Sequence, residues 1–190
     1  TWKLSLAHPE RVRALILLDA GGFPNENQKK PPLAFQLLAT PFGRWALENL
    51  ETRPLTKASL RNSLLNNPVV TDDFITRWVD VQRAPGHRRI LMSTMGGVEG
   101  ADPVKLAQIK APTLILWGEG DPLIQVASAH KFASAIPGAE LITYPGVGHM
   151  PQLETPERSA ADAEAFLKRV LVSDADGKAS EGKTGAPASR

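Results

Sequence analysis

Two residues of this 190-residue sequence could work together as an acid and a base, namely Asp121 and His149. Each follows a short apolar run, and each stands in a loop that contains glycine. A carboxylate beside an imidazole fixes the tautomer of the ring and stabilises the imidazolium that forms when the ring takes a proton from a nucleophile. A second interpretation fits this spacing equally well: Asp121 caps the helix that follows it, and His149 is a solvent-exposed loop residue.

Three continuous apolar runs supply the strands that would position this pair: residues 12–18, 113–117 and 141–144. Apolar runs without alternation are typical of strands buried on both faces. Residues 126–136 have helical spacing, and strand, helix and strand in this order predict parallel strands. Neighbouring strands lie about 4.8 Å apart. The two loops therefore open together at the carboxyl edge of an α/β sheet, where such proteins place their sites.

Two other segments depart from the strand pattern. Residues 24–93 carry amphipathic helical patterns, one of which Thr71 can cap, and predict a helical insertion between two strands. A further helix is predicted from Pro156, and from Ser173 onward the composition offers nothing to bury, which predicts a disordered tail. The expected organisation is a sheet domain in residues 1–23 and 94–172, a helical segment in 24–93 and a tail in 173–190.

The expected sheet is small for its class. Three buried strands are few for a covered parallel sheet, which typically has about five or six strands. The strand at 12–18 should be an interior one, yet the sequence offers no partner for its outer edge. The first residue is Thr1 rather than Met. We therefore expect the chain to be the carboxyl-terminal part of a longer protein.

The composition excludes several classes of protein. The 22 basic and 20 acidic residues give a net charge of +2, without a dense basic cluster, so nucleic acid and acidic membrane surfaces are not implied as partners. The absence of cysteine excludes a disulfide framework and a thiolate nucleophile. No apolar run reaches the roughly 18 residues of a membrane span. The cellular compartment and the oligomeric state stay open, since a cysteine-free chain suits the cytoplasm and other compartments alike.

Three motifs resemble those of the α/β-hydrolase superfamily. Residues 117–122 (Trp-Gly-Glu-Gly-Asp-Pro) look like its W-G-x-x-D acid loop, and residues 148–157 are similar to its G-H-x-P-x-x-E-x-P-E histidine loop. The His-Pro-Glu-Arg-Val stretch at 8–12 resembles the segment after the nucleophile elbow. The motifs follow the family's order, and the resemblance implies that Asp121 orients His149, which acts as base and then acid for an upstream serine.

One element of the family pattern has no counterpart. A G-x-S-x-G turn would stand before residue 1. Ser5 lies on a predicted helix without flanking glycines, and Ser93 lacks the first glycine, so we exclude both as nucleophiles. Asp19 ends the first strand, where some relatives of the family keep their acid. It is therefore an alternative to Asp121, weighed against a structural role in capping the glycine turn that follows it.

The resemblance implies a cap-bearing, esterase- or lipase-like enzyme that cleaves an ester or similar bond of a small, largely apolar substrate. Carbon–carbon bond hydrolysis, cofactor-free haloperoxidase chemistry and dehalogenation are alternatives within the superfamily. A ligand-binding protein without catalytic activity is the alternative from another class. The residues expected to bind substrate are Trp45, Leu123 and Met150, with Phe35 and Phe42 as further candidates for the pocket wall.

The remaining histidines add no second site to this prediction. His8, His87 and His130 have no acidic partner at useful spacing, and we interpret them as structural or exposed. No sequence cluster has the spacing of metal ligands, and no glycine-rich phosphate loop follows a strand. We expect neither a metal nor a cofactor.

Overall fold

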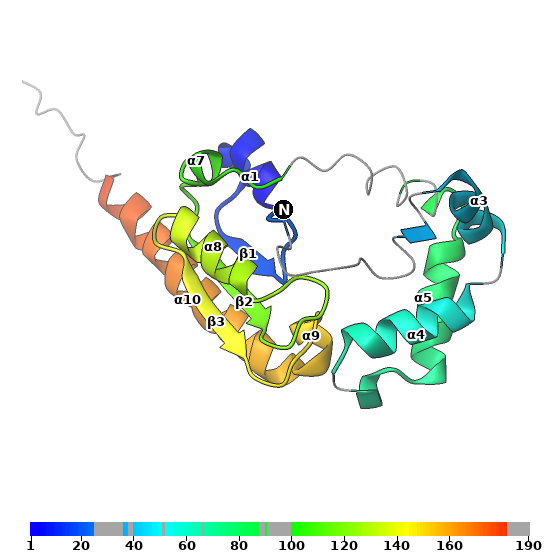
Figure 1. Cartoon of the computed structure of the whole chain (residues 1–190). Coiled ribbons are helices and arrows are strands. Elements are labelled where there is room, and N and C mark those ends of the chain that lie inside the picture. Colours follow the sequence, from blue (N-terminus) through cyan, green and yellow to red (C-terminus); the bar gives the residue numbers. More distant parts are fainter. Residues whose placement is uncertain are drawn as a thin grey trace, which may run out of the picture.

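A computed structural model describes residues 1–24, 36–37, 40–50, 52–65, 67–87, 90 and 100–181 of the chain (Figure 1). Within these residues three strands form one sheet in the order β1-β2-β3, and both pairs are parallel. The expected α/β architecture is confirmed. The strands are β1 (Leu15–Leu18), β2 (Thr113–Gly118) and β3 (Glu140–Tyr144).

Helices cover both faces of the sheet because alternate residues of the central strand point to opposite sides. Ile115 and Trp117 of β2 belong to a core that includes residues of α1, α7 and α8, whereas Leu114 and Leu116 pack with Phe166 of α10. All six residues of β2 are buried, as a strand covered on both faces requires. These helices are α1 (Trp2–Ala7), α7 (Pro103–Leu106), α8 (Ala127–Ala135) and α10 (Pro156–Glu181).

The first strand is shorter and more exposed than its sequence predicted. Val12 follows the short 3-10 helix η1 (Pro9–Arg11), so the strand begins only at Leu15. Leu15 and Leu17 are buried, but Leu18 is 38% exposed. The reason is the position of β1 in the sheet: among the described residues it is paired on one side only, with β2.

Between residues 24 and 93 the described residues form helices and no strand. Helices α4 (Arg53–Ser63) and α5 (Asp72–Arg83) pack together around a core that contains Leu60, Leu64 and Ile75. Figure 1 shows these helices beside the sheet rather than on either face. The remaining elements of this range are α3 (Pro41–Asn49) and the 3-10 helix η2 (Asn67–Val69).

The sequence predicted the start of helix α5 correctly. The Thr71 hydroxyl accepts a hydrogen bond of 3.1 Å from the Phe74 N–H and so caps α5 as predicted. Val81 has the helical spacing that would place it on the same face as Phe74, yet Val81 is exposed, and so is Leu65. The Gly22 carbonyl accepts from the Ala101 N–H at 2.8 Å, which ties the two ends of the helical segment together. Gly96 and Gly97, which follow the helical segment in the sequence, lie outside the described residues.

The last helix runs further than the composition predicted. Helix α10 continues to Glu181, whereas a disordered tail was expected from residue 173. The overlap contains Ala175, Lys178 and Ala179, residue types that favour helix. Residues 182–190 lie outside the described part of the chain. None of the described helices combines the length and apolarity that crossing a bilayer requires.

The ends of β2 and β3 approach each other at a glycine pair. A Cβ atom on Gly118 would lie 1.9 Å from the carbonyl oxygen of Gly148 and 2.6 Å from that of Val147. A Cβ atom on Gly148 would in turn lie 2.4 Å from the Ser63 carbonyl oxygen. Both obstacles are backbone atoms, which cannot swing aside. The loop after β3 can therefore pack against the end of β2 only because Gly118 has no side chain, and against the end of α4 only because Gly148 has none.

We expect Gly118→Ala to lower the free energy of unfolding by about 2 kcal/mol or more, since it overpacks a site walled by backbone. Gly21→Ala is the matched control, because its Cβ atom would meet only the Ile124 Cδ1 atom, at an ordinary 3.9 Å. Thermal and urea unfolding of both variants measures the difference. Equal stability of the two variants would show that the loops can separate without cost.

Candidate active site

Asp121 and His149 meet at the carboxyl edge of the sheet. Asp121 follows β2, His149 follows β3, and the His149 Nδ1 atom lies 2.8 Å from the Asp121 Oδ2 atom. The Asp121 side chain has no exposed surface, and the His149 side chain is 21% exposed. A carboxylate oxygen only accepts, so Nδ1 carries the proton in this contact and Nε2 is left as the basic nitrogen. This is the geometry of an orienting acid and a general base.

The second oxygen of Asp121 is held by its own loop. Oδ1 accepts hydrogen bonds from the backbone N–H groups of Leu123, at 2.7 Å, and Ile124, at 3.0 Å. The interpretation that Asp121 caps the next helix is wrong, because α8 begins at Ala127 with Val126 at its N-cap and has no side-chain cap. Oδ1 instead holds the turn that follows β2, while Oδ2 contacts the imidazole. One carboxyl group performs both tasks, because its two oxygens point to different partners.

The histidine loop is fixed by backbone contacts on either side of the ring. The His149 N–H donates to the Ser63 carbonyl at 2.9 Å. Glu154, at the end of α9 (Pro151–Glu154), is buried, and its Oε1 atom accepts from the N–H groups of Gly148 at 3.0 Å and Met150 at 3.3 Å. The motif that contains Glu154 was recognised in the sequence, but its contacts with both neighbours of the histidine were not foreseen.

Asp19 is a second buried carboxyl group at the same edge. It directly follows β1, and its Oδ1 atom accepts from the Gly118 N–H at 3.0 Å. The residue is 4% exposed and has a φ of +40°, a left-handed conformation that aspartate tolerates better than most residues. Burial, with the nearby Asp121 carboxyl adding to it, raises the pKa of Asp19 to about 8. Asp19 does not cap the glycine turn as predicted, because the N–H group that donates to its Oδ1 atom belongs to Gly118 of β2.

Asp19, Asp121 and His149 each place one possible ligand atom within 4.8 Å of the others. Sequence spacing did not reveal this cluster, because the three residues come from three different strand ends. Distance alone would allow a cation here. The contact between the ring nitrogen and Asp121, however, already fits an acid–base pair, and we interpret the cluster in that way.

The residues predicted to bind substrate are spread over the structure. The Leu123 N–H group donates a hydrogen bond to Asp121, and the Met150 side chain packs against the core of α4 and α5. Trp45 is not brought to the acid–base pair: it is 52% exposed on α3, a helix that lies apart from β2 and β3 in Figure 1, and it stacks on Phe42 with 5.9 Å between ring centroids. Phe35 lies outside the described residues.

Ser5, His8 and His87 show no link to the pair among the described contacts. The Ser5 hydroxyl donates to the Trp2 carbonyl of its own helix at 2.7 Å, a structural role. His87 contacts the Val81 carbonyl at 2.6 Å, and His8 lies 3.6 Å from Glu10. Ser93 falls outside the described residues.

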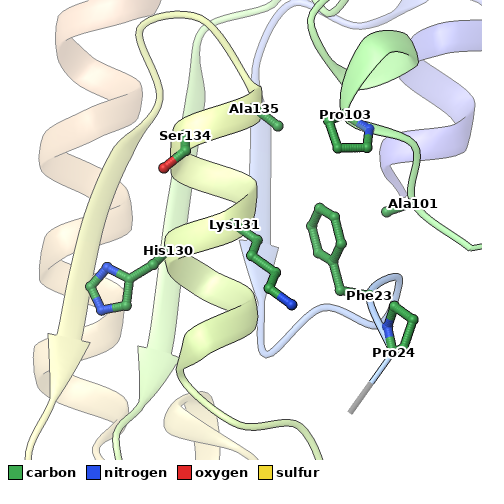
Figure 2. Close-up of a pocket in the computed structure, with 8 residues that line it drawn as sticks. All are labelled: Phe23, Pro24, Ala101, Pro103, His130, Lys131, Ser134 and Ala135. Atoms are coloured by element: carbon green, nitrogen blue, oxygen red, sulfur yellow. The ribbon is translucent and has the colours of Figure 1, made fainter. Parts of the chain in front are cut away.

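A cavity of about 600 Å³ lies elsewhere, between α8 and the segments around Phe23 and Ala101 (Figure 2). Phe23 lines it and contacts Phe132 edge-on, with 4.8 Å between ring centroids. Neither Asp121 nor His149 lines this cavity, so it does not belong to the acid–base pair. The residues that line it are Phe23, Pro24, Ala101, Pro103, His130, Lys131, Ser134 and Ala135.

Comparison with curated proteins relates the chain to hydrolases. It is 31% identical over 172 residues to a 2-hydroxy-6-oxononadienedioate/2-hydroxy-6-oxononatrienedioate hydrolase of Comamonas testosteroni. It is also 31% identical over 179 residues to a 2-hydroxy-6-oxo-6-phenylhexa-2,4-dienoate hydrolase of Burkholderia cepacia. Each match covers 88% of this chain but only 56% of the relative, so the chain spans little more than half of their length. A shorter match, 36% over 61 residues, relates it to Lipase 1 of Psychrobacter immobilis.

Solved structures share the fold. The meta-cleavage product hydrolase of Pseudomonas fluorescens IP01 superimposes with a TM-score of 0.71 over 88% of this chain and 60% of its own, at 16% sequence identity. The model of the family described as "Alpha/beta hydrolase family" matches residues 3–163. This match includes the loops that carry Asp121 and His149. It confirms the resemblance found in the sequence, and the chain belongs to the alpha/beta hydrolase family.

Proposed function

We propose that this chain carries the acid–base pair of a hydrolase that breaks a carbon–carbon bond in a substrate of the 2-hydroxy-6-oxo-dienoate class. The observation that carries the proposal is the 2.8 Å contact between His149 and Asp121, in a chain that aligns over 88% of its length with relatives named for such substrates. These names favour carbon–carbon hydrolysis over the ester hydrolysis that the motifs alone suggested.

The proposed chemistry requires a proton carrier. A 2-hydroxy-6-oxo-dienoate has no ester bond, so its hydrolysis must break the bond between the ketone carbon and the dienoate. The hydroxyl of water ends on the ketone carbon, giving a carboxylic acid, and a proton ends on the carbon of the departing fragment. His149 would take a proton at Nε2 and return it, and Asp121 would stabilise the imidazolium in between.

We also propose that helices α4 and α5 form part of a cap over this edge. The support is direct contact: the Ser63 carbonyl at the end of α4 accepts from the His149 N–H, and Met150 packs against the core of α4 and α5. In this proposal Met150 and Leu123 line the space in front of the imidazole. A cap in this position would exclude bulk water from the site, apart from the water that reacts, which strengthens the electrostatic interactions inside.

Ester hydrolysis is the second candidate function. The 61-residue match to a lipase favours it, and the same acid–base pair would serve it, because an acyl transfer also needs the nucleophile's proton removed and returned. The two functions differ in the leaving group, which is carbon in one case and oxygen in the other. A direct comparison of substrates separates them.

We expect the full-length protein to hydrolyse a 2-hydroxy-6-oxo-dienoate, followed through the loss of its dienolate absorbance, with a higher kcat/KM than a short p-nitrophenyl ester. His149→Ala should lower kcat by about 10³-fold or more, and Asp121→Asn by about 10⁴-fold, since an amide holds the wrong tautomer.

His8→Ala is the control for loss of a histidine, because its side chain is exposed and contacts Glu10 rather than the pair. A kcat/KM that is higher for the ester would reverse the order of the two candidates. Full activity of Asp121→Asn together with loss in Asp19→Asn would move the role of the acid to Asp19.

Glu154 tests whether the histidine loop must be held in place. We expect Glu154→Ala to lower kcat by about 10-fold or more with little change in KM, because the N–H groups on both sides of His149 lose their acceptor. Glu154→Gln keeps an oxygen at the same position and should retain most of the activity. Steady-state kinetics with the preferred substrate gives both numbers; equal losses in the two variants would point to the charge of Glu154 instead.

A further inference from the structure

The Asp19 carboxyl group contains an oxygen that the acid–base pair leaves unexplained. Its Oδ1 atom accepts from the Gly118 N–H, but its Oδ2 atom is buried and has no hydrogen-bond partner, alone among the buried side-chain oxygens and nitrogens of the described residues. A buried polar atom without a partner costs about 1–3 kcal/mol, and more if it is charged. Natural structures rarely carry that cost without a reason.

The neighbours of this oxygen make a negative charge especially unfavourable. Asp19 and Asp121 each place a carboxylate oxygen in the cluster that spans 4.8 Å with His149, and Glu154 adds a further negative charge nearby. Two carboxylates that share a dry site cannot both remain charged, so one of them keeps a proton. Asp121 is already stabilised as an acceptor by two backbone N–H groups and the imidazole, whereas Asp19 has one N–H donor.

We propose that Asp19 is a positioning residue, which keeps a proton on its buried Oδ2 atom and donates it as a hydrogen bond to the carboxylate of Asp121. The three groups would then form a line from a neutral carboxylic acid through a carboxylate to the imidazole of His149. No proton leaves Asp19 during turnover. Its role is to keep the negative charge on Asp121, where it faces His149, and to hold that carboxylate in one orientation.

The pKa of Asp19, raised by burial to about 8, agrees with this assignment at neutral pH. The charged or titratable groups around it come from several elements: Asp121 from the loop after β2, His149 from the loop after β3, Glu154 from α9 and Tyr144 from β3. All but His149 are acidic groups, so the surroundings favour the neutral form of Asp19.

The proposal rests on the proposed function only in that Asp121 and His149 work as a pair.

Two variants separate a proton donor from a charged group. Asp19→Asn keeps an oxygen for the Gly118 N–H and an N–H₂ group for Asp121, so we expect kcat at pH 7 within about 3-fold of the parent. Asp19→Ala removes both contacts, and we expect kcat to fall by about 10-fold or more with KM little changed. The measurement is steady-state kinetics of the full-length protein with the preferred substrate of the preceding section.

Infrared spectroscopy gives a readout that does not need turnover. We expect a protonated-carboxyl band at pH 6–7 in the parent protein that is absent from Asp19→Asn and shifted in Asp121→Asn, because the acceptor of the proton then changes. If the enzyme proves inactive on every substrate but this band is present and shifts, the proposed function fails and the role of Asp19 stands.

Stability gives an independent measurement with a defined sign. The pKa of Asp19 is higher in the folded protein than in the unfolded chain, so the parent loses stability as the pH rises from about 4 to about 8. Asp19→Asn lacks this group, and its melting temperature should rise relative to that of the parent over this range and then level off.

Three results would overturn the proposal. The first is absence of the carboxyl band. The second is equal loss of kcat in Asp19→Asn and Asp19→Ala, which would mean that Asp19 acts as an anion. The third is a stoichiometric divalent metal in the purified protein, since a cation would give the Oδ2 atom a different partner.

Discussion

The Asp121 carboxyl group is completely buried, and a buried polar group needs hydrogen-bond partners on every side. Its own loop supplies two of them, from Leu123 and Ile124, and the next loop supplies the His149 ring. Because the His149 ring is one of these partners, the hydrogen bonding of Asp121 also holds the imidazole in position. Any change that separates the two loops would leave the carboxyl group short of a partner, which is energetically costly.

That coupling depends on how closely the ends of β2 and β3 approach. The parallel register pairs Gly118 with Tyr144, so both chains leave the sheet at the same level. The absence of a side chain at Gly118 then lets the loop after β3 pack backbone against backbone, and its absence at Gly148 lets the same loop approach the end of α4. Helix α4 completes the arrangement from outside the sheet, because the Ser63 carbonyl accepts from the His149 N–H. The fold therefore brings together parts that are distant in sequence.

The elements and the principal pair could be predicted from the sequence because their signals are local. The buried run of β2, the Thr71 cap and the glycine loops before Asp121 and His149 each follow from a few consecutive residues. Asp19 was recognised as an alternative acid at a strand end, but its contacts could not be predicted, because its partners, the Gly118 N–H and the cluster with Asp121, are about a hundred residues away. The exposure of Leu18 and Val81 likewise depends on which neighbours are present, and no local pattern contains that information.

The same edge holds two aspartates in unequal surroundings, and this inequality assigns their roles. Asp121 has two backbone N–H donors and a contact with the histidine, all of which stabilise a negative charge. Asp19 has one backbone donor and an oxygen without a partner, an environment that favours the neutral acid. A pair of titratable groups whose environments push their protonation apart is how one site can hold a charged acceptor and a neutral donor at the same pH. Because Asp19 follows β1 and Asp121 follows β2, the pairing of these two strands sets that difference.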